Sequence, residues 1–241
     1  MINDVKVIDN FYSNPDDIVN LLRGDYPIIG CGSGKRSVGL QELSPTLFYH
    51  FKKAILSIHG LDGRNMNLFT FFMEHEYNPV EVFNHNWVHI DGKNPDACRM
   101  TLDDYKLIVC GQIFLTPNPD LECDIELCKV KSELGWTKQD LIDRTINDYT
   151  NPREDLHMGK ITQSDFEKMH NEYHDCFNTT SIIKNVYNRM VSWPGGTLHG
   201  ARMNKNMPSR LTQFFFVQSM GPLDTWPGDP TPTVKWSKND R

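Results

Sequence analysis

The sequence predicts a mainly β protein with flanking helices, a mixed α+β class, and three observations carry that prediction. Runs rich in β-branched and aromatic residues recur at 65–77, 105–116, 123–130, 187–193 and 210–217. Two helical patterns precede the first of these runs, and a polar helical stretch, about 131–182, interrupts the series. The 241 residues are enough for one large β domain with a buried core, so we expect a single domain.

Residues 1–64 are expected to form a helical support for the sheets. Asn14-Pro15-Asp16-Asp17 combines a capping side chain, a proline and acidic residues, which is typical of a helix start, and this helix should end near Gly24. Ser44-Pro45 opens a second helix, in which apolar residues from Leu47 to Ile58 recur at three- and four-residue steps. This spacing predicts a helix packed on a sheet.

The glycine-rich stretch 30–37 invites comparison with a phosphate-binding loop but departs from that motif. The motif needs four residues between its first glycine and Gly-Lys, and a Ser or Thr directly after the lysine, whereas position 29 is Ile and position 36 is Arg. We therefore expect a flexible loop from which Lys35 and Arg36 reach toward a substrate.

Residues 65–220 are expected to form the β core, with 131–182 as a helical insertion between its strands. A capping box at Ser164-Asp165-Phe166-Glu167 predicts a helix that runs toward Phe177. Long insertions at such positions commonly act as lids or recognition elements, so we expect this one to cover a site. The stretch 221–241 is rich in Pro, Gly, Asp and Trp and is expected to form a tail.

Composition limits the classes of partner. The net charge of −6 gives no general attraction to a nucleic-acid backbone. No apolar run is long enough to span a bilayer, and the first residues lack a signal-peptide pattern, so we expect a cytoplasmic protein without a membrane partner. Six cysteines without a Cys-x-x-Cys pair indicate reduced thiols. The oligomeric state stays open.

The candidate site residues begin with His89 and Asp91. In an extended strand they point to one side while Ile90 points to the other, so two metal ligands face one pocket. His199 follows a glycine turn far downstream and is the candidate third ligand. Two alternatives remain: a His-x-Asp tripeptide can be a chance surface or core pair, and if 84–91 were helical, His85 and His89 would form the pair instead.

Arg210 opens a strand that is apolar on both faces, and Thr212 shares its face. A buried arginine needs a partner, and its planar fork fits a carboxylate, either of a ligand or of an internal Asp or Glu. His170 and His174, four residues apart, could bind zinc as a pair, but a solvated helix face is the preferred interpretation.

Taken in order, the His-x-Asp segment, a strand, a glycine turn, His199 and Arg210 resemble the iron(II)- and 2-oxoglutarate-dependent oxygenases over roughly 65–220. The likeness is strongest to the prolyl hydroxylase-like branch, and the chain is also similar to small uncharacterised phage and bacterial members. The resemblance implies a double-stranded β-helix, or jelly roll. It further implies iron(II) bound by His89, Asp91 and His199.

The resemblance also implies 2-oxoglutarate and dioxygen as cosubstrates. Arg210 would hold the distal carboxylate of 2-oxoglutarate, with Thr212 where the family more often has serine, and Tyr77 would contact the same molecule. An aromatic residue at a strand end is the plainer interpretation of Tyr77.

The implied reaction is hydroxylation or a related oxidation of a C–H bond, with release of succinate and carbon dioxide. The substrate, which could be a protein side chain, a nucleobase or a small molecule, is not identified by the sequence. The alternatives are a non-catalytic, cupin-like jelly roll that binds a metal or ligand, and a metal-dependent hydrolase. Arg210 and Thr212 favour the oxygenase over both.

Overall fold

The structure is a computed structural model that describes residues 4–22, 28–31, 34–63, 66–76, 88–91, 106–117, 124–145, 151–202 and 209–219. Its elements follow one another as β1 (Lys6–Ile8), α1 (Pro15–Leu22), β2 (Ile28–Cys31), β3 (Gly34–Ser37), α2 (Leu40–Leu43), α3 (Pro45–Ile58), β4 (Met66–Glu76), β5 (Lys106–Phe114), β6 (Ile125–Val130), the 3-10 turn η2 (Ser132–Leu134), α4 (Lys138–Thr145), α5 (Asn151–His157), α6 (Gln163–His174), β7 (Phe177–Ile183), β8 (Met190–Pro194), β9 (Leu198–Ala201) and β10 (Ser209–Ser219).

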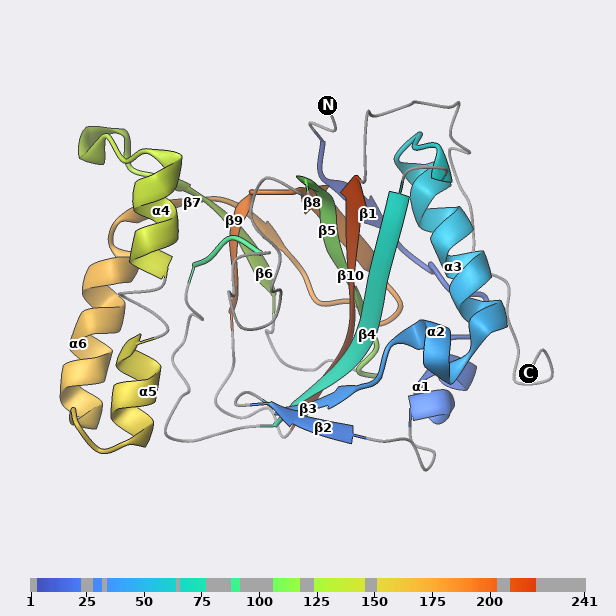
Figure 1. Cartoon of the computed structure of the whole chain (residues 1–241), viewed down its shortest axis with the longest axis horizontal. Coiled ribbons are helices and arrows are strands. Elements are labelled where there is room, and N and C mark those ends of the chain that lie inside the picture. Colours follow the sequence, from blue (N-terminus) through green and yellow to red (C-terminus); the bar gives the residue numbers. More distant parts are fainter. Residues whose placement is uncertain are drawn as a thin grey trace.

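The described strands form two antiparallel sheets that face each other, as in a double-stranded β-helix (Figure 1). The large sheet has the strand order β1-β8-β5-β10-β4-β3-β2, and the small sheet has the order β7-β6-β9. β10 lies between β4 and β5, and β4 pairs with it along its whole length, from Met66–Ser219 to Glu76–Ser209. The mainly β fold with flanking helices, expected from the strand-like runs, is confirmed.

The outer face of the large sheet packs against α1 and α3 (Figure 1). Phe51 of α3 is fully buried there against Phe215 of β10, with ring centroids 5.6 Å apart. The helix begins where the sequence indicated, because Ser44 caps it by accepting a hydrogen bond from the Leu47 amide. This layer fixes one face of β10, so the alternate residues of β10 must face the small sheet.

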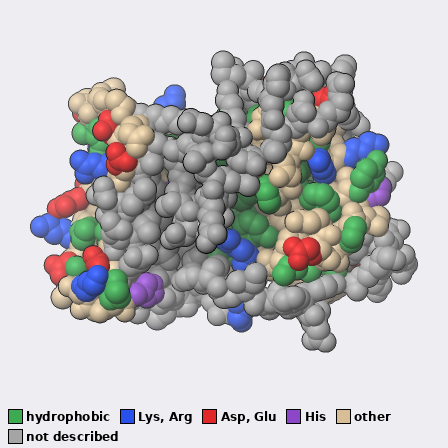
Figure 2. Space-filling view, in the orientation of Figure 1, with side chains coloured by type: hydrophobic (Ala, Val, Ile, Leu, Met, Phe, Trp, Pro, Cys, Tyr) green, Lys and Arg blue, Asp and Glu red, His purple; other side chains and the backbone are tan. Residues whose placement is uncertain are grey.

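The space between the sheets holds a second core. Phe216 of β10 packs there with Cys110 and Trp193 of the large sheet and with Leu127 and Ala201 of the small sheet. Because side chains alternate along a strand, Arg210, Thr212 and Phe214 share this inner face with Phe216. Figure 2 shows hydrophobic side chains set back over β10, with Lys or Arg side chains beside them.

The helices of the insertion lie on the far side of the small sheet (Figure 1). Phe166 and Tyr173 of α6 pack there against Cys128 of β6 and Leu198 of β9. The expectation of a lid is wrong for α6, because its buried side chains cover the outer face of the small sheet and not the space between the sheets. The expected end of the insertion is also wrong: β7, up to Ile183, pairs with β6 as a strand of the sheet.

Three other local predictions are corrected. In the stretch predicted as a flexible loop, residues 30–31 and 34–37 belong to the paired strands β2 and β3, and residues 32 and 33 lie outside the described residues. The segment 1–64, predicted as a helical support, therefore also contributes the three strands β1, β2 and β3 to the large sheet. The capping box that opens α6 joins Thr162 and Asp165 and not Ser164 and Glu167.

The solvated helix face predicted for His170 and His174 is also wrong. His170 is buried, and His174 lies 3.3 Å from the buried carboxylate of Glu126 on β6. The expected strand at 187–193 begins only at Met190, because Asn188 has a positive φ of 62° in a turn that hydrogen-bonds Tyr12.

Residue Tyr77 and the stretch 221–241 lie outside the described residues. Among the helices that the structure describes, none combines the length and apolar character needed to cross a membrane.

Candidate metal centre

The candidate site forms where the His89 segment meets β9. The His89 amide donates to the His199 carbonyl at 2.9 Å, and the His199 amide donates to the His89 carbonyl at 3.0 Å. This pair of bonds is the hydrogen-bonded pairing of an antiparallel sheet, confined here to one residue on each side. It brings together two segments that are far apart in the sequence.

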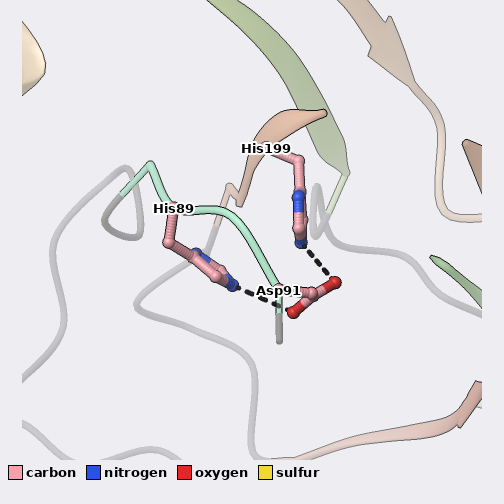
Figure 3. Close-up of side chains that lie close together, drawn as sticks. All are labelled: His89, Asp91 and His199. Atoms are coloured by element: carbon pink, nitrogen blue, oxygen red, sulfur yellow. Dashed lines mark ion pairs between the residues drawn. The ribbon is translucent and has the colours of Figure 1, made fainter. Parts of the chain in front are cut away.

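Alternation along the His89 segment separates its polar and apolar side chains. Val88 and Ile90 are buried with Phe166 and Tyr173 on the outer face of the small sheet. His89 and Asp91 therefore point the other way, toward His199 (Figure 3). The strand-like alternation proposed from the sequence accounts for this arrangement, and the positions 84–87 of the helical alternative lie outside the described residues.

The nitrogen and oxygen atoms of the three side chains converge. Nε2 of His199 lies 3.2 Å from Oδ2 of Asp91, and Nε2 of His89 lies 3.7 Å from Oδ1 of the same carboxylate (Figure 3). One ligand atom from each of the three side chains lies within 4.8 Å of the others. Two metal–ligand bonds of about 2.1 Å at a right angle separate the ligand atoms by about 3 Å. The three side chains therefore fit a single metal ion bound on one of its faces.

The tautomer of His199 is fixed by a backbone bond. Its Nδ1 lies 2.9 Å from the Thr197 carbonyl oxygen, which only accepts hydrogen bonds, so Nδ1 carries the proton. In the neutral ring the lone pair of Nε2 then faces Asp91. Two electron-rich atoms 3.2 Å apart repel unless a proton or a metal cation lies between them, and such a backbone bond is the usual support of a metal-binding histidine.

Electrostatics favour the charged form of Asp91. Burial alone would raise its pKa, but without a metal the protonated rings of His199 and His89, through their charge and the hydrogen bonds that they donate, outweigh burial and hold the pKa of Asp91 well below its usual range. A carboxylate that stays ionised beside two imidazoles is a suitable donor set for a divalent transition metal.

Two neighbours of this group were not anticipated. Burial and the adjacent Asp91 carboxylate, which accepts a hydrogen bond from the thiol, raise the pKa of Cys110. The Trp193 ring lies 4.7 Å from the His199 ring, centroid to centroid. Both belong to the large sheet, where Cys110 pairs with Trp193 across β5 and β8. Only strand pairing brings them to the site, so no local sequence signal pointed to them.

Arg210 and Thr212 lie on the inner face of β10, and both are buried. Within the described residues, the Thr212 hydroxyl has no hydrogen-bond partner. Thr212 pairs with Phe114 of β5, whereas Phe216 pairs with Cys110, so Thr212 lies four residues closer to the start of β10 than the residue at the level of Cys110. Arg210 and Thr212 therefore face the same space between the sheets as the His–Asp–His group, but they lie at a different level along the strands.

Of the two basic residues predicted to reach a substrate, Arg36 stands over the Phe71 ring, 4.3 Å from its centroid. Phe71 in turn contacts Phe214 and Phe216, so Arg36 borders the inner face of the large sheet. Lys35 is exposed on the opposite face of β3.

Comparison with solved structures supports this fold. HygX from Streptomyces hygroscopicus, with nickel and 2-oxoglutarate bound, superposes with a TM-score of 0.51 at 11% identity, over 90% of this chain and 83% of HygX. The non-heme alpha-ketoglutarate-dependent carbocyclase SnoK from nogalamycin biosynthesis gives 0.50 at 13% identity, over 94% of this chain and 83% of SnoK. The described sheets therefore share the overall fold of HygX and SnoK.

The viral collagen prolyl hydroxylase vCPH from Paramecium Bursaria Chlorella virus-1 superposes with a TM-score of 0.41 at 10% identity, over 90% of each chain. No protein-family profile and no curated protein sequence matches the chain.

Proposed function

We propose that this protein is an iron(II)- and 2-oxoglutarate-dependent dioxygenase that hydroxylates or otherwise oxidises a C–H bond of an organic substrate. The convergence of His89, Asp91 and His199 is the observation that carries the proposal. Two histidines and one carboxylate on one face of a metal leave other positions for cosubstrates, as in non-heme iron(II) oxygenases. When bound, iron and 2-oxoglutarate let dioxygen oxidise the substrate, with release of succinate and carbon dioxide.

The candidate ligand side chains are already oriented by neighbouring residues in the metal-free protein. The bond from His199 Nδ1 to the Thr197 carbonyl keeps Nε2 available as a ligand atom, and the thiol of Cys110 lies beside the Asp91 carboxylate. Trp193 and Phe216 exclude water from the same space. These residues would hold the metal, orient its ligands and keep competing water away.

The cosubstrate would lie between the metal ligands and the far end of the inner face. The planar fork of Arg210 would bind the distal carboxylate of 2-oxoglutarate, and the Thr212 hydroxyl would donate to the same group. A buried hydroxyl without a protein partner among the described residues favours a ligand there. A metal-binding jelly roll without turnover, or a hydrolase, has no use for such a pair.

The test is an anaerobic titration with iron(II) followed by 2-oxoglutarate, monitored through the visible charge-transfer band that the two produce together. We expect His89→Ala, Asp91→Ala and His199→Ala each to weaken iron binding more than about a hundredfold in a folded protein, because one of only three protein ligands is lost. His50→Ala, which removes an exposed histidine of α3, is the control.

Wild-type iron affinity in folded His199→Ala would remove His199 from the ligand set. A wild-type protein that binds iron but gives no visible band with 2-oxoglutarate would favour the non-oxygenase alternatives.

A further inference from the structure

Among the described residues, the segment that carries His89 and Asp91 is bound to the small sheet through the bridge between His89 and His199. The amide and carbonyl of His89 both point toward His199. In an antiparallel pairing the flanking residues direct their backbone groups the opposite way, so the carbonyl of Val88 points away from β9. The Val88 side chain is fully buried, and a buried carbonyl at a sheet edge is costly unless it accepts a hydrogen bond.

That hydrogen bond comes from the insertion. The hydroxyl of Tyr173, on α6, donates to the Val88 carbonyl oxygen at 2.8 Å, and this bond is buried. The ring of Tyr173 packs against Phe177 with a centroid distance of 5.0 Å, in the cluster that also contains Val88 and Ile90. The tyrosine therefore meets the His89 segment with both its polar and its apolar parts.

Helix α6 is itself firmly fixed at both ends. The capping box of Thr162 and Asp165 closes its first turn. In its last turn, next to Tyr173, His174 lies 3.3 Å from the buried carboxylate of Glu126, which also accepts a hydrogen bond from Thr179. Glu126 pairs across the small sheet with Gly200, the residue after His199. The same helix is thus tied to both chain segments that supply the histidines.

We propose that Tyr173 is a positioning residue for the metal centre: by holding the Val88 carbonyl, it fixes the backbone from which His89 and Asp91 extend. Through α6, the insertion then supports the site from the outer face of the small sheet. This inference rests on the proposed function in one respect, that His89 and Asp91 bind a metal.

The test compares Tyr173→Phe with Tyr12→Phe. Each change removes one buried hydroxyl: Tyr173 donates to Val88, whereas Tyr12 donates to Gln213 on the opposite face of the large sheet. Losses of thermal stability should be similar, so a difference in metal binding reports position and not folding. We expect iron(II) to bind Tyr173→Phe roughly tenfold more weakly than wild type, as for other residues that orient metal ligands, and to bind Tyr12→Phe normally.

A second measurement needs no metal. Hydrogen exchange of the His89 and His199 amides, measured on the metal-free protein, should be several-fold faster in Tyr173→Phe and unchanged in Tyr12→Phe, because the bridge loses its outer support.

The two measurements separate the two proposals. Equal iron affinity in wild type and Tyr173→Phe, with unchanged exchange at the bridge, would overturn the positioning role and leave the proposed function intact. If wild type bound no iron, the proposed function would fail and the exchange result alone would decide whether Tyr173 holds this segment. If Tyr173→Phe and Tyr12→Phe lost the same iron affinity, the effect of Tyr173 would be a general effect on stability, and the positioning role would be wrong.

Discussion

Arg210 combines a permanent charge with a side chain that is only 3% exposed. A buried cation is tolerated only where negative charge and hydrogen bonds compensate for lost hydration. Arg210 lies near the start of β10, on the same inner face as Thr212. A carboxylate that enters between the sheets could therefore reach the guanidinium and supply negative charge. The role that we propose for Arg210 in binding 2-oxoglutarate can be tested separately from the metal ligands.

We expect Arg210→Lys to weaken 2-oxoglutarate binding by about 1.5 to 3 kcal/mol, or ten- to a hundredfold, because lysine keeps the charge but loses the planar fork. Iron(II) affinity should be unchanged. The measurement is the visible band in a titration with 2-oxoglutarate at saturating iron.

The matched control is Arg189→Lys, which breaks a forked pair with Asp9 beside β1 and β8, on the side of the large sheet away from β4. If Arg210→Lys and Arg189→Lys bound 2-oxoglutarate equally well, Arg210 would be a structural ion-pair residue.

Strand β5 reaches the site only because β10 can lie close beside it. Gly111 follows Cys110 in β5, so its side-chain position is on the outer face of the large sheet, opposite to Asp91. The partner of Gly111 on β10 is Phe215. A Cβ atom at Gly111 would come within 2.3 Å of the Phe215 ring and 2.6 Å of the Val191 carbonyl oxygen. The ring can shift, but the carbonyl belongs to the neighbouring strand β8 and is fixed by the sheet.

We expect Gly111→Ala to lower the free energy of unfolding by about 1 to 3 kcal/mol, as overpacking in a core does. Chemical denaturation of the metal-free protein measures this change. Gly135→Ala is the contrasting variant, because its positive φ of 60° is mildly strained for alanine but no atom lies within 4 Å of the added carbon. A larger loss in Gly135→Ala than in Gly111→Ala would show that space at Gly111 does not limit the sheet.

The sequence predicted elements whose signal is local. Strand alternation was enough to place His89 and Asp91 on one side of the chain, and the Ser44-Pro45 cap was enough to begin α3. The hairpin β2–β3 was missed because residues 30–37 lack the apolar alternation of a half-buried strand. Strand β7 was missed because its middle residues, 178–182, are polar or exposed and only its pairing with β6 defines it.

Other features depend on contacts that no local pattern contains. Two polar pairs at a three-residue spacing compete to cap α6, and only the structure shows that Thr162 and Asp165 form the box. His170 and His174 looked like a solvated pair because the strand beneath them, with Glu126, is distant in sequence. Cys110 and Asp91 also come together only because the two sheets face each other.

The molecule is built in four layers: α1 and α3, the large sheet, the small sheet, and the helices of the insertion (Figure 1). His59, which caps the end of α3, joins the first two layers through a 3.0 Å hydrogen bond between its Nε2 and the hydroxyl of Ser192 on β8. Burial, aided by the charge of Lys6, lowers the pKa of His59 to about 4. The imidazole is therefore neutral in the folded protein at neutral pH.

This pKa shift predicts a pH dependence of stability. Between about pH 6.5 and pH 4 the unfolded chain binds a proton at His59 and the folded protein does not, so stability falls as the pH falls, by up to about 1 kcal/mol per pH unit. Below pH 4 both states are protonated and this contribution stops changing.

His59→Gln should remove that part of the slope when unfolding is measured at several pH values, and His50→Gln, at an exposed position of α3, should leave it unchanged. An identical slope in wild type and His59→Gln would show that His59 is not the group that titrates.

The central place of β10 also determines when the protein can fold during synthesis. Strands β4 and β5 do not bond to each other; each bonds to β10, which is the last of the described strands to be made. Until β10 leaves the ribosome, both strands expose open edges, and the space between the sheets has no wall on that side. The chain must therefore stay unaggregated through most of its translation, and its site closes in one late step that depends on distant contacts.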